Sequence, residues 1–297
     1  MVENPFTCAG AWYRANLHAH TTASDGDLSP ADAAAFYRRA GYDILAITDH
    51  WNVVEPASEH PDFLLLSGLE YNVGRAAQGT SYHIVGLDVS SRGKVPRRPE
   101  AGAQETIDAI RAASGEAFIA HPYWSGLMAS DITPLRGCFA VEVYNTGCDI
   151  EILRGYSTVQ WDDLLTLGWT CGALAVDDGH RHQHDHGGAW TMIRAEELSA
   201  PAVIEALRRG RYYASIGPEI LDLRVTEDRV QVATSPVASI ALVSAPENGG
   251  RCQAAEGESL TGGEFPLPRA PYARVEISDA KGRCAWSNPF PGRPKEA

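Results

Sequence analysis

The segment Asn16-Leu-His-Ala-His-Thr21 sets two histidines, His18 and His20, two positions apart at the end of a short apolar run. Residues two apart in a strand point to the same face of the sheet, so a single metal ion can take both imidazoles. An isolated pair of this kind is equally well explained as two hydrogen-bonded histidines. The rest of the chain therefore has to decide whether the pair belongs to a metal site.

Further ligand-type side chains lie at or just after the ends of other apolar runs of the chain. Imidazole and carboxylate are the usual ligands of zinc, manganese and iron. Because the carboxyl ends of barrel strands open on one mouth, side chains from distant positions are expected to converge there. The sequence therefore predicts a multi-metal hydrolytic site. The expected metal ligands are His18, His20, Asp25, His50, Glu70, His83, His121, Asp178 and His180.

From residue 14 to about residue 215, apolar runs of strand length alternate with segments that carry helix start and end signals. Short apolar runs are typical of strands buried in a parallel sheet. The alternation predicts an α/β fold, namely a closed or nearly closed seven-stranded barrel with helices outside. The expected strands are residues 15–17, 44–48, 63–70, 82–87, 117–120, 140–143 and 170–176. The expected helices are residues 31–40, 106–114, 161–167 and 201–209.

The pattern changes after Ser215. Short strand-like runs, separated by Gly, Pro, Asn and Asp, replace segments of helix length. This change predicts two domains, a metallohydrolase barrel at residues 1–215 and a small β-rich domain at residues 216–297. The expected strands of the second domain are residues 221–225, 230–233, 240–243 and 273–278.

Composition restricts the partners. The net charge of −13 argues against binding to a nucleic-acid polymer or an anionic membrane, and favours a small-molecule substrate. We see neither a signal peptide nor the roughly 18 consecutive apolar residues that a membrane helix needs, so a cytoplasmic protein is expected. The six cysteines form no C-x-x-C motif and are interpreted as scattered buried thiols.

Taken in order, the motifs resemble those of the PHP (polymerase and histidinol phosphatase) superfamily over about residues 12–215. The C-terminal segment resembles the tail of stand-alone phosphoesterase-like members, and within the superfamily the chain is similar to the branch of carbaryl-hydrolase-like (CehA/McbA) metallohydrolases. The resemblance implies a distorted seven-stranded (β/α) barrel with two or three metal ions. The matching motifs are Asn16-Leu-His-Ala-His-Thr21, Ser24-Asp-Gly26, Leu45-Ala-Ile-Thr-Asp-His50, Glu70, Ala120-His-Pro122 and Asp178-Gly-His180.

Carried over motif by motif, the resemblance also implies how the ligands are divided among the ions. A carboxylate, Asp25, stands where some members have a histidine, which favours manganese or iron over zinc at the third ion. The first ion would be held by His18, His20, Glu70 and Asp178, the second by Glu70, His83 and His121, and the third by Asp25, His50 and His180.

Such a cluster suits hydrolysis. Neighbouring cations lower the pKa of a bridging water and neutralise the charge that develops on a phosphoryl or acyl group. We therefore expect a phosphoesterase in which Glu70 bridges two ions, Asp178 binds one of them and Arg181 meets an anionic group. Because Arg75 and Arg181 are the only obvious basic candidates, a carbamate, amide or ester hydrolase stays open, as does a non-catalytic metal-binding scaffold.

The segment Arg181-His-Gln-His-Asp-His186 has three interpretations. It is a flexible polar loop, a lid or substrate clamp at the barrel mouth, or a separate histidine-rich metal site. Asp49 is expected to orient a neighbouring ligand, and alternation turns Asp177 away from the face of Asp178. The expected substrate-pocket residues are Arg75, Tyr123, Tyr144, Asn145 and His182, whereas His60 is expected to be structural or exposed.

Overall fold

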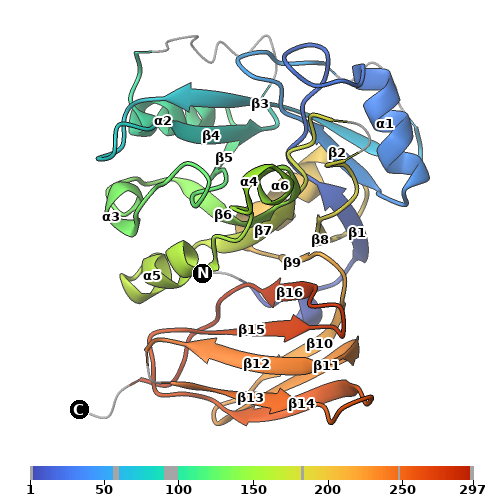
Figure 1. Ribbon diagram of the computed structural model, residues 1–297, viewed down its shortest axis with the longest axis vertical. Helices are drawn as coiled ribbons and strands as arrows, with labels where there is room; N and C mark the ends of the chain where they lie inside the picture. Colours follow the sequence, from blue (N-terminus) through green and yellow to red (C-terminus); the bar gives the residue numbers. More distant parts are fainter. Residues whose placement is uncertain (1–2, 56–59, 90–99, 182–183, 247, 295–297) are drawn as a thin grey trace.

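The computed structural model describes residues 3–55, 60–89, 100–181, 184–246 and 248–294. Up to Ser215 the chain alternates between strands and helices, as shown from blue to yellow in Figure 1. The strands are β1 (Ala11–Asn16), β2 (Ile44–Ile47), β3 (Leu64–Val73), β4 (Tyr82–Leu87), β5 (Glu116–Ile119), β6 (Cys138–Asn145), β7 (Gly172–Val176), β8 (Trp190–Ala195) and β9 (Tyr212–Ser215). The helices are η1 (Pro5–Thr7), α1 (Pro30–Arg39), α2 (Ala103–Ala112), α3 (Ala129–Ile132), α4 (Thr146–Ile152), α5 (Thr158–Thr166) and α6 (Ala200–Arg209).

Strands β1 to β7 are hydrogen-bonded neighbours in chain order, and the segments that follow β1 and β7 come together. A parallel bridge joins Ala19, after β1, to Gly179, after β7. Around this bridge the N–H of Asp178 donates to the carbonyl of His18 at 2.9 Å, and the N–H of His20 donates to the carbonyl of Gly179 at 3.0 Å. The first and last ligand motifs therefore lie side by side.

The predicted regular alternation of strand and helix is wrong around β4. The pairs β1–β2, β2–β3, β5–β6 and β6–β7 are parallel, but β4 runs antiparallel to both β3 and β5. Residues 74–81 between β3 and β4 form no helix, and Gly74 and Gly79 take positive φ angles of 60° and 87° in the connecting turn. A mixed α/β fold is confirmed, and the closed seven-stranded barrel stays a prediction.

The helix signals in the sequence act as expected. The Ser29 hydroxyl accepts a hydrogen bond from the N–H of Asp32 at the start of α1, and Ser199 caps α6 in the same way. Helix α6 ends at Gly210, whose φ of 75° suits a residue without Cβ. Helix α2 begins at Ala103, three residues earlier than the sequence indicated. None of the described helices is long and apolar enough to cross a membrane.

After Ser215 the described residues form strands and no helix, as predicted. These strands occupy the lower half of Figure 1, in orange and red. The division at residue 215 stays a prediction. Strand β9 pairs with β8 on one side and with β16 on the other, so one sheet contains strands from both predicted domains. The strands are β10 (Ile220–Val225), β11 (Arg229–Val237), β12 (Ser239–Ser244), β13 (Gly249–Gln253), β14 (Leu260–Pro266), β15 (Ala273–Ser278) and β16 (Cys284–Ser287).

A buried arginine ties this β-rich part to α5. The Nε and Nη2 atoms of Arg274, on β15, each donate to a carboxylate oxygen of Asp162 at 2.7 Å, and Nη1 donates to Glu276 at 2.8 Å. The guanidinium carbon lies 4.8 Å from the centre of the Trp161 ring. With Arg274 only 2% exposed, its charge depends on these partners for compensation.

Replacing Arg274 with Leu is therefore expected to lower the free energy of unfolding by about 2–3 kcal/mol, because Asp162 is left without its bidentate partner. Urea unfolding measures the change. The matched control is Arg224→Leu, since Arg224 is 71% exposed in its pair with Asp222 and should contribute less than about 1 kcal/mol. Equal effects of the two substitutions would contradict this account of the link to α5.

Candidate metal centre

Four buried donor atoms face one another at the centre of the predicted site. Nε2 of His18 lies 3.1 Å from Nε2 of His20, 3.4 Å from Oε2 of Glu70 and 3.2 Å from Oδ1 of Asp178. Nε2 of His20 lies 3.2 Å from each of the same two oxygens. A tetrahedral zinc ion with bonds of 2.0–2.1 Å holds its ligands about 3.3–3.4 Å apart. The spacing therefore fits a metal ion.

The chemistry of these atoms supports the same conclusion. Oδ1 of Asp178 is buried and has no hydrogen-bond partner in the part of the chain that the structure describes. A buried carboxylate oxygen without a partner is unfavourable unless a cation compensates it. Asp178 and His121 also take positive φ angles of 52° and 25°, which is strained for residues other than glycine. Such strain is typical of residues held in place for a function.

Glu70 connects this group to a second one. Its Oε1 lies 2.6 Å from Nδ1 of His83 and 3.4 Å from Nε2 of His121, while its Oε2 faces the first group. The 2.6 Å separation is a hydrogen-bond distance, so an ion bound here would move Glu70 and His83 slightly apart. Glu70 lies inside β3 rather than at its end, since the strand continues to Val73 and pairs with β4 there.

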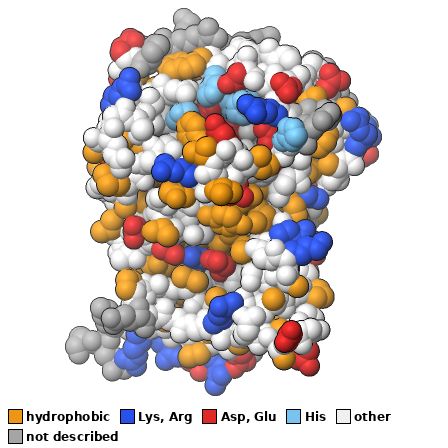
Figure 2. All heavy atoms as spheres, viewed as in Figure 1, with side chains coloured by type: hydrophobic (Ala, Val, Ile, Leu, Met, Phe, Trp, Pro, Cys, Tyr) orange, Lys and Arg blue, Asp and Glu red, His pale blue; other side chains and the backbone are white. Residues whose placement is uncertain are grey.

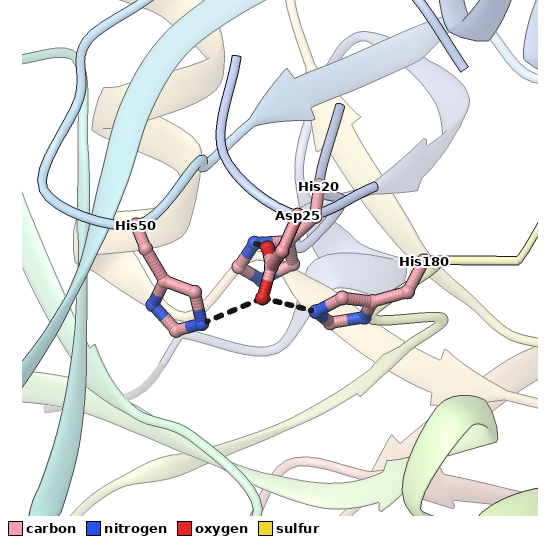
Figure 3. A group of neighbouring side chains, drawn as sticks. All are labelled: His20, Asp25, His50 and His180. Atoms are coloured by element: carbon pink, nitrogen blue, oxygen red, sulfur yellow. Dashed lines mark ion pairs between the residues drawn. The ribbon is translucent and has the colours of Figure 1, made fainter. Parts of the chain in front are cut away.

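A third group consists of His20, Asp25, His50 and His180, whose side chains point toward one another (Figure 3). Oδ2 of Asp25 is 3.6 Å from Nε2 of both His50 and His180, and Oδ1 is 3.3 Å from Nδ1 of His20. The side chains of His50, His180 and Asp25 are 23%, 31% and 52% exposed, so this group is more accessible to solvent than the other two. The structure thus brings together all nine predicted ligands, in three overlapping groups.

Glu142 holds two of the predicted ligands, His18 and His121, in place, a role that the sequence did not reveal. Its Oε1 lies 2.7 Å from Nδ1 of His18, and its Oε2 accepts the backbone N–H of His121 at 2.7 Å. A carboxylate behind a metal-binding imidazole fixes the ring and its tautomer. Asn145 donates to Oε2 of Glu142 at 2.9 Å and to Oδ2 of Asp178 at 3.1 Å. The signal in the sequence that could have indicated this role is the position of Glu142 inside the apolar run of β6.

Two further aspartates hold the surrounding loops. Asp49 does not contact the ring of His50; it accepts hydrogen bonds from Thr21 and from the hydroxyl of Ser24, at 2.6–2.8 Å, and so fixes the loop that leads to Asp25. Asp177 turns away from Asp178, as alternation predicted. It accepts the hydroxyls of Tyr37 and Thr146 and the N–H groups of residues 187–189, which anchors the loop after the last motif.

The charges of the centre are arranged for a cation. Burial opposes a charged imidazole, but the carboxylates of Asp178, Glu142 and Glu70 outweigh it and raise the pKa of His18 to about 10. Burial likewise opposes the charge of Glu70, yet the histidines around it hold the pKa of that carboxyl well below its usual range. Protons thus compensate the buried carboxylates in the protein alone, and metal binding displaces them.

Members of all three groups line a cavity of about 570 Å³, although His18 and His20 are not among its lining residues. In Figure 2, pale-blue histidines gather there beside red carboxylates, in the upper half of the face shown. One wall is partly apolar: it contains Trp124, whose Nε1 donates to Glu151 at 2.8 Å, together with Ile150 and Cys148. Arg181 and His184, which follow the last ligand motif in the chain, also line the cavity.

The predicted substrate residues are only partly at this cavity. Arg181 lines the cavity, whereas Asn145 does not line it and instead donates a hydrogen bond to Asp178. Arg75 donates to the carbonyl of Gly79, and neither it, Tyr123 nor Tyr144 is among the described residues that line the cavity. The roles of Arg75, Tyr123 and Tyr144 at a substrate therefore stay predictions. His182 lies outside the described residues. His60, expected to be structural, lines a separate apolar hollow beside α1.

Comparisons with known proteins bear on the fold. No protein-family model and no curated protein matches the sequence. Among solved structures, a two-domain protein from Bacteroides vulgatus containing a predicted PHP-like metal-dependent phosphoesterase has a TM-score of 0.53 and 15% identity, covering 98% of this chain and 97% of that one. At this identity the likeness shows the fold alone. The predicted PHP-like fold is therefore confirmed, and the carbaryl-hydrolase-like branch is not specified.

Two weaker structural matches are an amidohydrolase from Chromobacterium violaceum and a lesion-specific endonuclease from Pyrococcus furiosus. The amidohydrolase has a TM-score of 0.42 and 16% identity, covering 58% of this chain and 89% of that one. The endonuclease has a TM-score of 0.46 and 13% identity, covering 67% of this chain and 56% of that one.

Proposed function

We propose that this chain is a metal-dependent hydrolase that cleaves a small-molecule phosphoester, using two or three divalent ions of manganese, iron or zinc. The observation that carries the proposal is Glu70, whose two oxygens face two different groups of donor atoms. A carboxylate in that position would hold two cations close together. When bound, such ions supply Lewis acidity at the substrate oxygens and an activated water.

The remaining residues have positioning and binding roles. Glu142 holds the ring of His18, and Asn145 holds the carboxylate of Asp178, so the donor atoms keep their directions. Trp124 and the solvent-exposed Ile150 form the partly apolar side of the cavity. Arg181 is placed to bind an anionic oxygen of the substrate by a charge-assisted hydrogen bond.

A phosphoester is favoured because an ion held by the third group, with Asp25, could bind the oxygens of a tetrahedral anion together with the ions of the other two groups. A specific observation supports a carbamate, amide or ester as the second candidate. Among the described residues lining the cavity, Arg181 is the only Lys or Arg, whereas the acidic residues Asp27, Glu151 and Asp185 also line the cavity. That arrangement suits a substrate with less negative charge.

A substrate panel on the metal-loaded protein distinguishes the two. It should contain nucleotides, sugar phosphates, a cyclic phosphodiester, aryl carbamates and amides. We expect a phosphoester to have the highest kcat/KM and the Asp25→Ala variant to lose much of it. If carbamates or amides were cleaved much faster and Asp25→Ala kept full activity, the second candidate would replace the first. No hydrolysis of any substrate by a metal-loaded protein would favour the non-catalytic scaffold.

The Arg181→Ala variant should have a kcat/KM about 10- to 150-fold lower on an anionic substrate, because a lost charge-assisted contact is worth roughly 1.5–3 kcal/mol. Steady-state kinetics on the best phosphoester measure this. The matched control is Arg75→Ala, since Arg75 donates to the Gly79 carbonyl and does not line the cavity. An unchanged kcat/KM for Arg181→Ala would mean that the loop is only a polar connection.

A further inference from the structure

A cysteine lies beside the donor atoms of the second group. Cys148, in the first turn of α4, is 4% exposed, lines the cavity, and has its Sγ 4.0 Å from Oδ2 of Asp178. Donor atoms of His121, Cys148 and Asp178 all lie within 4.8 Å of one another. The same Oδ2 is 3.7 Å from Nε2 of His121. Imidazole, thiolate and carboxylate are the three side-chain ligands that zinc prefers.

The position of Cys148 is fixed by the residue that fixes a metal ligand. Oδ1 of Asn145 accepts the backbone N–H of Cys148 at 2.9 Å, while its Nδ2 donates to Oδ2 of Asp178 at 3.1 Å. One amide group therefore holds both the cysteine and the carboxylate in place. Among the described cysteines, no other belongs to a group of potential metal ligands.

We propose that Cys148 is a thiolate ligand of a metal ion, together with His121 of the second group and Asp178 of the first, and that it makes this position selective for zinc. The inference rests on the proposed metal centre and deepens it. A tetrahedral zinc ion holds a thiolate sulfur and a carboxylate oxygen about 3.5 Å apart, so the observed 4.0 Å requires a movement of only about half an ångström. On binding, the thiol loses its proton to solvent as the sulfur–metal bond forms.

The three positions then differ in their preference for metals. Thiolate is a soft ligand that selects zinc over manganese, whereas the exposed carboxylate of Asp25 suits a harder ion.

Cobalt substitution tests the proposal without measuring activity. Metal-free protein is titrated with Co²⁺, and the expected result is a near-ultraviolet sulfur-to-cobalt charge-transfer band that saturates at about one equivalent and is absent from Cys148→Ser. The matched control, Cys252→Ser, removes a half-buried cysteine outside the centre and should keep the band. In a competition between zinc and manganese, Cys148→Ser should lose about one zinc per chain by elemental analysis.

The outcomes separate this proposal from the function it rests on. Cobalt bound with visible bands of nitrogen and oxygen ligation, but without a charge-transfer band, would overturn the role of Cys148 and leave the hydrolase standing. No cobalt bound at all would overturn the metal centre itself. If Cys148→Ser does not fold, ¹¹³Cd NMR of the wild-type protein decides: a downfield shift typical of sulfur ligation supports the proposal, and its absence overturns it.

Discussion

The Glu70→Gln variant is expected to lose hydrolytic activity by about a thousandfold or more and to retain at least one metal ion fewer than the wild type. Glu70 is 1% exposed and directs one oxygen to each of two donor groups. The amide of glutamine has a similar shape but no charge, and its nitrogen cannot bind a cation. A thousandfold loss corresponds to about 4 kcal/mol, a value reasonable for the electrostatic contribution of a metal ion.

The matched control is Glu116→Gln. Glu116 is also buried, at 4% exposed, but lies in β5 and pairs with Arg208 away from the centre. This variant should keep its metal content and its activity, although it should be less stable. His60→Ala should likewise change little. Steady-state kinetics and elemental analysis on all three variants provide the test, and wild-type activity in Glu70→Gln would refute the bridging role.

Removal of metal is expected to reduce activity below about 1% of the original, and two or three divalent ions per chain should restore it. The buried donor atoms of His18, His20 and Asp178 are close enough together to bind a cation but have no other shared purpose. Because only the folded chain presents them together, metal should also stabilise the fold, by about 4 kcal/mol at a concentration about 1,000 times the Kd.

The measurements are elemental analysis of protein purified without chelator, thermal unfolding with and without metal, and activity after adding manganese, iron or zinc. Magnesium or calcium at the same concentration serves as a control, since hard cations bind weakly to imidazole. Fewer than one ion per chain, combined with no activation by any of the three metals, would refute the proposed centre and with it the hydrolase.

Much of the site was predictable because its ligands belong to local motifs. His18 and His20 are two apart, and such spacing favours a shared direction in extended backbone, although both residues follow β1 rather than lying in it. The separation of Asp177 from Asp178 followed from the same alternation and is confirmed. Helix starts at Ser29 and Ser199 were also readable, since a capping hydroxyl acts on N–H groups only two or three residues away. Local geometry of this kind does not depend on the rest of the fold.

The centre of the sheet was less predictable. The run at residues 82–87 is a strand, as expected, but it pairs antiparallel with both neighbours. Apolar runs buried on both faces look the same in parallel and antiparallel pairs, so the direction of β4 is not encoded in its own residues. The turn at Gly74 and Gly79 decides it, by returning the chain without a helix.

The sequence by itself determined the nine candidate ligands, the helix starts at Ser29 and Ser199 and the change to strands after Ser215, because each depends on neighbours along the chain. Only the tertiary structure decided which side chains support those ligands. Glu142, Asn145 and Cys148 meet Asp178 or His18 across gaps of 30 or more residues. Their contacts arise because β6 pairs with β7 and because the segment after β7 lies beside the segment after β1, and such pairings depend on the direction of side chains in space, which spacing along the chain does not specify.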